Sequence, residues 1–169
     1  MLIFNPLRKP ALFSIVSILG AGMRRGCMIS TLSFLALGGV APAQAQAVKI
    51  VRNDPGGAVE NRLHEIAQLR LAGTRIEIRG ECVSACTMLL GLPNTCVARS
   101  SRLGFHGPQS QYYGVSLAPD QFEYWSQVMA DHYPAAMRAW FIKEARKTTM
   151  GVITISGSQA IKMGARACM

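Results

Sequence analysis

The sequence predicts an α/β domain built on parallel strands and preceded by an N-terminal hydrophobic segment. Short runs in which apolar and polar residues alternate, such as residues 74–79, are interleaved along the chain with segments of helical period. This alternation of strands and helices favours a layer of parallel strands, because each helix returns the chain to the start of the next strand. Of the 169 residues, about 120 follow the hydrophobic segment, which is enough for one domain with a buried core.

The predicted elements begin at residue 48. We expect strands at residues 48–52, 74–79, 95–99 and 103–106, and helices at residues 58–73, 84–90, 120–129, 135–147 and 156–163. The first strand ends at a Pro-Gly-Gly turn, and the helix after it carries Val59, Leu63 and Ile66 on one apolar face. Gly73 is suited to end that helix, because glycine adopts the left-handed conformation readily.

Proline and aspartate divide the second half of the domain. Pro93 ends the short apolar helix, and Asp120 is a suitable N-cap for the helix after a polar loop. Pro134 interrupts that helix, and the next one continues with apolar Met137 and Phe141. The aromatic residues of these two helices, at helical spacing, favour packing over a binding surface.

Three short motifs accompany three of the predicted strands. They are residues 54–57 (Asp-Pro-Gly-Gly), residues 80–87 (Gly-Glu-Cys-Val-Ser-Ala-Cys-Thr) and residues 102–108 (Arg-Leu-Gly-Phe-His-Gly-Pro). Small residues around Ser84 allow a sharp turn from strand to helix, which places its hydroxyl at a helix N-terminus. The N–H groups there favour negative charge, as a nucleophilic serine with an oxyanion site requires. Taken alone, the same serine also fits an ordinary helix N-cap.

The order and spacing of these motifs resemble the Clp protease proteolytic subunit and its relatives. On these motifs the chain is identified as a member of the Clp/crotonase superfamily, in a short secreted bacterial branch with a Cys-x-Ser-Ala-Cys-Thr motif. The resemblance covers residues 48–167 and implies a Clp/crotonase-like parallel sheet with flanking helices.

The resemblance also implies roles for individual residues. Ser84 would be the nucleophile and His106 its general base, in agreement with the need of a serine hydroxyl for a base near pH 7. The backbone N–H groups of Gly57 and Ala85 would bind the oxyanion, with Gly56 shaping the loop. A packed core histidine is the alternative interpretation of His106.

Two features depart from the family pattern. Aligning the closing signature at residues 159–164 places Val152 where the Clp peptidase carries an aspartate, and no carboxylate lies nearby in the sequence. Without that group, a Ser–His dyad oriented by a backbone carbonyl is the remaining catalytic arrangement. The family fold also has a strand and a helix before the Pro-Gly-Gly strand, so we expect the sheet to be truncated at its N-terminal edge.

These observations support two functional hypotheses. The first is a secreted serine hydrolase, specifically a peptidase acting on extended peptides, which can pair with the edge of a sheet. The alternative is a non-catalytic Clp-like scaffold that binds peptides or envelope partners. Acyl-CoA chemistry, as in crotonases, is disfavoured by the compartment and by the pattern of Ser84 and His106. We expect no cofactor, and a homo-oligomer is left open.

The first 47 residues are predicted to be a signal peptide or an N-terminal hydrophobic segment. A basic start at residues 23–26, an apolar run at residues 31–40 and overlapping Ala-x-Ala sites at residues 41–47 fit a secretory signal. Translation from Met23 is the preferred account, an uncleaved anchor the rival, and a membrane hairpin of both apolar runs the third. We therefore expect a periplasmic or secreted domain that contacts the membrane only through this segment.

The chain is basic, with a formal net charge of +9. Four of its basic residues, Arg8, Lys9, Arg24 and Arg25, belong to the N-terminal segment, and the others do not form a stripe with interleaved aromatics. Nucleic-acid binding is therefore disfavoured, and a solvated basic surface is the simpler interpretation.

Of five cysteines, four belong to the domain: Cys82, Cys86, Cys96 and Cys168. An even number in an exported domain favours disulfides. We predict a Cys82–Cys96 bridge, with Cys86–Cys96 as the other candidate and Cys168 free or pairing late. The pair Cys82–Cys86 is the least favoured, and four reduced thiols are the alternative. The Cys82-x3-Cys86 spacing also matches half of a metal site, but without a second ligand pair we expect no metal.

Overall fold

The strands and helices predicted from residue 48 onward alternate as expected in the computed structural model, which describes residues 45–110, 112 and 115–169. Residues 1–44 of the predicted signal peptide lie outside these described residues. The strands are β1 (Val48–Asp54), β2 (Arg75–Val83), β3 (Thr95–Val97), β4 (Arg102–Phe105) and β5 (Ile153–Ser156). The helices are α1 (Val59–Leu71), α2 (Pro119–Ala130), α3 (Ala135–Lys143) and α4 (Gly157–Lys162), with the 3₁₀-helices η1 (Ser84–Gly91) and η2 (Ala145–Lys147). None of the described helices is both long and apolar enough to cross a bilayer.

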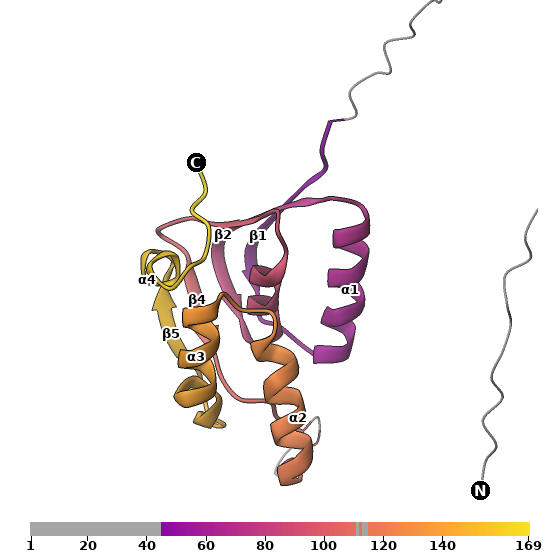
Figure 1. Cartoon of the computed structure of the whole chain (residues 1–169), viewed down its shortest axis with the longest axis vertical. Coiled ribbons are helices and arrows are strands. Elements are labelled where there is room, and N and C mark those ends of the chain that lie inside the picture. The colour runs from indigo at the N-terminus through magenta and orange to yellow at the C-terminus, as the bar shows by residue number, and fades with distance from the viewer. Residues whose placement is uncertain (1–44, 111, 113–114) are drawn as a thin grey trace, which may run out of the picture. The chain divides into compact units, whose positions relative to one another are not determined.

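The strands form a mixed sheet in the order β1–β2–β4–β5, with β3 also paired to β2. Figure 1 shows β1 beside β2 and β4 beside β5. The first four strands are parallel, as predicted, whereas β5 runs antiparallel to β4. β5 is a strand that we did not predict, although Ile153 and Ile155 alternate with Thr154 and Ser156 in the period of a half-buried strand. In the described part of the chain, β1 is an edge strand.

Three of the parallel strands end at the same edge of the sheet. The pairing places Asp54 at the end of β1 beside Cys82 of β2, and Val83 of β2 beside Gly104 of β4. The segments that leave these strands therefore begin close together, at the carboxyl edge where ligands bind in open α/β sheets. This topology brings the three sequence motifs to one place.

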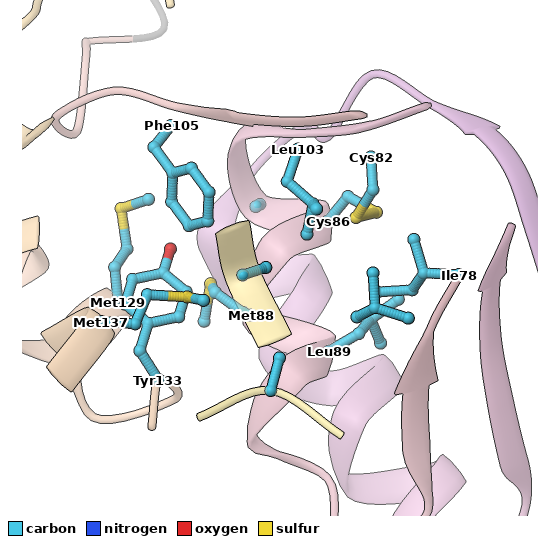
Figure 2. Packing of buried hydrophobic residues seen from close by; sticks show 14 of the residues in the cluster. Ile78, Cys82, Cys86, Met88, Leu89, Leu103, Phe105, Met129, Tyr133 and Met137 are labelled. Carbon is cyan, nitrogen blue, oxygen red and sulfur yellow. A yellow bond between two sulfur atoms is a disulfide. The ribbon is translucent and has the colours of Figure 1, made fainter. Parts of the chain in front are cut away.

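η1 forms the centre of the core. It contacts β2, β3 and β4, and both α1 and α2 contact it. Its residues 85–89 are fully buried, and Figure 2 shows Met88 and Leu89 among side chains from the sheet and the helices, including Ile78 and Met137. Full burial of one such aliphatic side chain is worth about 1.5–3 kcal/mol. The predicted buried helix is thus present, as a 3₁₀-helix.

Phe105, the last residue of β4, is fixed by aromatic packing. Its ring makes edge-to-face contacts with Tyr133 and Trp140, with ring centroids 5.5 and 5.2 Å apart. Such contacts are geometrically specific, and Phe105 is fully buried. Because His106 follows directly, this packing determines where the chain leaves the sheet.

The predicted Cys82–Cys96 disulfide is wrong. The structure pairs Cys82 with Cys86 and Cys96 with Cys168. Glu77 of β2 is the residue beside Cys96, and Cys82 lies five residues farther along β2, about 16 Å away at the rise of a strand. The chain terminus instead returns to β3, where the N–H of Cys168 donates to the carbonyl of Val97 at 3.0 Å. Cys168 is therefore neither free nor distant from Cys96.

The two bridges constrain the chain to different extents. The chain-entropy relation gives about 2 kcal/mol for a sequence separation of 4 and about 4 kcal/mol for one of 72. The bridge to the C-terminus therefore contributes more to global stability, whereas the short bridge acts mainly on the turn that it encloses.

Candidate active site

Ser84 occupies the turn between β2 and η1 in a strained backbone conformation. Its φ is +57°, and it is the only described residue other than glycine with a positive φ. Such a conformation costs on the order of 1–3 kcal/mol and persists where neighbouring contacts enforce it. Val83 before it is still extended, with φ −118° and ψ 151°, so the chain reverses direction at Ser84 itself. A sharp strand-to-helix turn of this kind exposes a serine hydroxyl.

A buried relay anchors the carbonyl of Ser84. The Thr87 hydroxyl donates to Ser84 O at 2.7 Å, and the Tyr133 hydroxyl lies 2.8 Å from Thr87 Oγ1. Because the Thr87 proton is used toward Ser84, Tyr133 is the donor of the second bond. Burial raises the pKa of Tyr133 above its ordinary value, so its hydroxyl keeps the proton that it donates.

The Pro-Gly-Gly loop after β1 packs directly against the serine turn. Gly56 and Gly57 have φ values of +101° and +123°, a region that favours glycine. A Cβ on Gly56 would lie 2.6 Å from Ser84 Cβ and 3.0 Å from Ala85 N, whereas one on Gly57 would meet nothing within 4 Å. The N–H of Gly56 donates to Asp54 Oδ1 at 2.9 Å. The amide that follows, that of Gly57, is therefore the loop's candidate donor to a ligand.

An ion-pair network fixes this loop to α1. Arg62 donates to both carboxylate oxygens of Asp54, at 2.9 and 2.8 Å, and to Glu65 at 2.6 Å. Lys49 of β1 also pairs with Glu65. Arg62 is only 7% exposed, and its Nη2 supplies both bonds to Asp54 while its Nη1 bonds Glu65, charge-assisted bonds that are stronger than neutral ones. Asp54 therefore connects the amide of Gly56 to a buried cation on the helix.

His106 follows β4, and the backbone orients its ring. His106 Nδ1 lies 2.6 Å from the carbonyl oxygen of Gly107. Because a carbonyl oxygen only accepts, Nδ1 carries the proton, and Nε2 is the basic nitrogen of the neutral ring. Gly107 is itself held closely, since its N–H donates to Thr148 O at 2.9 Å and a Cβ there would lie 2.0 Å from Arg146 O.

Val152 lies directly before β5, as His106 lies directly after β4. β5 pairs with β4 so that Ile153 faces Phe105. The ladder ends at this pair, because the next backbone bond joins Gly107 N–H to Thr148 O and departs from the register. Val152 is 44% exposed. The position inferred from the sequence for the missing aspartate thus lies just outside the end of the β4–β5 ladder that His106 follows.

The three motifs border one cleft of about 620 Å³. Ser84, His106 and Gly57 all line it, together with polar Gln109 and Ser110 and with apolar side chains, among them Trp125 of α2. Glu60, in the first turn of α1, is the one charged residue in the described part of the lining. The sequence analysis assigned Trp125 to packing, whereas it faces a space large enough for a peptide side chain.

The predicted site residues are therefore neighbours. No hydrogen bond joins the Ser84 hydroxyl to the His106 ring among the described contacts, and such bonds commonly tighten only when substrate is bound. Ala85 is fully buried next to Ser84, and Gly56 packs against both. The catalytic roles of Ser84 and His106 and the oxyanion roles of Gly57 and Ala85 stay predictions.

Four supporting residues were not predicted. They are Asp54, Arg62, Thr87 and Tyr133. The role of Asp54 could have been predicted from the sequence, because an aspartate at the start of a turn often accepts a hydrogen bond from the N–H two residues later. Thr87 also had a local signal, because a threonine hydroxyl often bonds a carbonyl three residues before it. Arg62 and Tyr133 had none, since they meet the site only through folding: Tyr133 is 46 residues from Thr87 in the sequence.

Comparison with solved structures identifies the fold class of this chain. No protein-family model matches the sequence, and no curated protein matches it. Solved structures do match, and they confirm the predicted class, an α/β sheet flanked by helices as in Clp-type serine proteases.

Two of these structures are of the 1510-N membrane-bound stomatin-specific protease. A lysine-to-alanine mutant in complex with a substrate peptide is 17% identical, with a TM-score of 0.55, over 70% of this chain and 58% of that chain. A serine-to-alanine mutant is 16% identical, with a TM-score of 0.53, over 70% of this chain and 62% of that chain. The chain thus spans about three fifths of the length of these structures, and at this identity the likeness shows the fold alone.

Proposed function

We propose that the protein is a secreted serine peptidase that cleaves extended peptide segments with a Ser84–His106 dyad. The observation that carries the proposal is a strained, half-buried serine and a backbone-oriented histidine lining the same cleft. The likeness to a protease solved with a substrate peptide supports the same reaction class.

In the proposed reaction, His106 Nε2 takes the proton of Ser84 Oγ as this oxygen attacks the carbonyl carbon of the scissile peptide bond. The N–H groups of Gly57 and Ala85 donate to the oxyanion that forms. His106 then gives the proton to the leaving amine, the C–N bond breaks, and an acyl ester remains on Ser84. A water molecule, deprotonated by the same ring, hydrolyses this ester and restores the serine.

The Gly107 carbonyl replaces the aspartate of a triad in orienting the ring. It fixes the tautomer, but it carries no formal charge and stabilises the imidazolium less than a carboxylate does. We therefore expect a slower enzyme than a peptidase with a complete triad.

The two disulfides support an extracytoplasmic location. Disulfides persist in oxidising compartments and are rare in the cytosol. Residues 23–47 support the same location, because a basic start, an apolar run and Ala-x-Ala sites follow one another there as in a secretory signal.

A non-catalytic peptide-binding scaffold is the second candidate function. It is favoured by one observation, a valine, Val152, at the sequence position inferred for the triad aspartate. A scaffold of this kind uses the same cleft and keeps the peptide intact.

Cleavage of a fluorescently labelled, unstructured protein such as casein distinguishes the two functions. The wild type should cleave it, Ser84→Ala should lose cleavage by on the order of 10³-fold or more, and Ser100→Ala, an exposed serine outside the cleft lining, should keep the wild-type rate. Binding without cleavage by the wild type, unchanged in Ser84→Ala, would establish the scaffold instead.

A further inference from the structure

We propose that the Cys82–Cys86 disulfide positions the nucleophile by holding Ser84 in its left-handed backbone conformation. The catalytic consequence rests on the proposed function, whereas the conformational claim does not.

The bridge encloses only Val83, Ser84 and Ala85, and it brings the Cα atoms of its two cysteines to 5.3 Å. A fully extended chain would separate residues four apart by about 13 Å. The bridged segment must therefore reverse direction between its two ends.

The sheet decides where that reversal occurs. Cys82 is held extended, because it pairs with Asp54 on one side and with Leu103 on the other. Val83 is also extended, and from Ala85 onward the chain is helical. The reversal therefore falls on Ser84, at φ +57°.

The bridge is built into the core. Both cysteines are fully buried, and Figure 2 shows their sulfurs joined near Leu103 at one end of η1. The other contacts of the turn are weaker constraints, since the Thr87 hydrogen bond holds only the Ser84 carbonyl and Gly56 packs against one side of the residue. The covalent bridge is the contact that excludes an extended Ser84.

The second disulfide offers a matched control. Cys96–Cys168 joins β3 to the C-terminal segment, and neither cysteine lines the cleft. Because it closes the longer loop, its removal should lower thermal stability at least as much. The two bridges thus separate a global effect from a local effect on Ser84.

The test compares C82A/C86A with C96A/C168A in the full chain. The Cα and Cβ chemical shifts and the HN–Hα coupling of Ser84, measured by NMR, report its backbone conformation. We expect Ser84 to leave the left-handed region in C82A/C86A and to keep it in C96A/C168A. The labelling rate of Ser84 by a fluorophosphonate, per folded molecule, should fall about tenfold or more in the first variant and stay within about twofold of wild type in the second.

A Ser84 that stays left-handed in C82A/C86A and reacts at the wild-type rate would overturn the proposal. If the wild type itself does not react with the fluorophosphonate, the proposed function fails, while the NMR comparison still decides the conformational claim.

A third variant covers the case in which C82A/C86A does not fold. Glycine adopts positive φ without strain, so adding Ser84→Gly to C82A/C86A should restore folding, as seen by circular dichroism and urea unfolding. A triple variant folded no better than C82A/C86A would contradict the proposal.

Discussion

The two halves of the candidate site differ in how firmly their functional groups are held. On the nucleophile side, Ser84 is enclosed by a buried disulfide, packed against Gly56 and hydrogen-bonded through its carbonyl. On the base side, one hydrogen bond among the described contacts orients His106, to the Gly107 carbonyl, and Val152, just before β5, is 44% exposed.

The difference indicates which part of the chemistry the fold supports best. Buried, short-range contacts fix the backbone at Ser84, and with it the direction in which the side chain leaves the chain. The histidine has the correct tautomer but only a neutral dipole behind it, so the charge that develops on its ring is poorly stabilised. In this account, the base side limits the rate.

The largest effect is expected from removing the base. His106→Ala should lower the rate of peptide cleavage about 10²- to 10⁴-fold, because the serine loses its proton acceptor. His64→Ala, an exposed histidine on α1, serves as the control and should have no effect. A His106→Ala enzyme as fast as wild type would show that another group activates the serine.

A smaller loss is expected from disturbing the nucleophile side. Gly56→Ala adds a Cβ that would lie 2.6 Å from Ser84 Cβ, so the loop or the serine turn must shift, and cleavage should fall about 10²-fold. Gly73→Ala is the matched control: its φ is +61° with nothing within 4 Å of the new Cβ. It should lose about 1 kcal/mol of stability in urea unfolding but no activity. Equal activity losses in both variants would point to general destabilisation.

The smallest change, and the only gain, is expected on the base side. Val152→Asp places a carboxylate at the sequence position inferred for the triad aspartate, and we expect kcat/KM for a peptide to rise about tenfold, a part of the effect of a triad aspartate. Val152→Asn has nearly the same shape without the charge and should stay at the wild-type value. A gain in both variants, or in neither, would refute the view that the missing charge limits the base.

The sequence was sufficient to predict the parallel strands and the convergence of the three motifs. The three motifs predicted a common site because each follows a strand of the same parallel sheet, and the carboxyl ends of such strands lie at one edge. β5 was missed because it is antiparallel to β4, so the alternation of parallel strands and helices did not predict it.

The disulfides show why contacts within the sheet were harder to predict. Predicting the Cys82–Cys96 bridge required knowing how β3 pairs with β2. In the structure Cys96 pairs with Glu77, five residues before Cys82 on β2. A pairing of Cys96 with the last residues of the chain depends on where the C-terminal segment returns, and no local pattern encodes that. Arg62 is similar, since a buried arginine on an otherwise amphipathic helix is explained only by its partner Asp54.

The central claim is that Ser84 is a nucleophile activated by His106 in this cleft. Incubating the purified protein with a fluorophosphonate and mapping the adduct by peptide mass spectrometry tests it most directly. We expect a single stoichiometric adduct on Ser84, absent in Ser84→Ala and slowed about 10²-fold or more in His106→Ala. A folded wild-type protein with no adduct on Ser84, or with an adduct that forms equally fast without His106, would contradict the account.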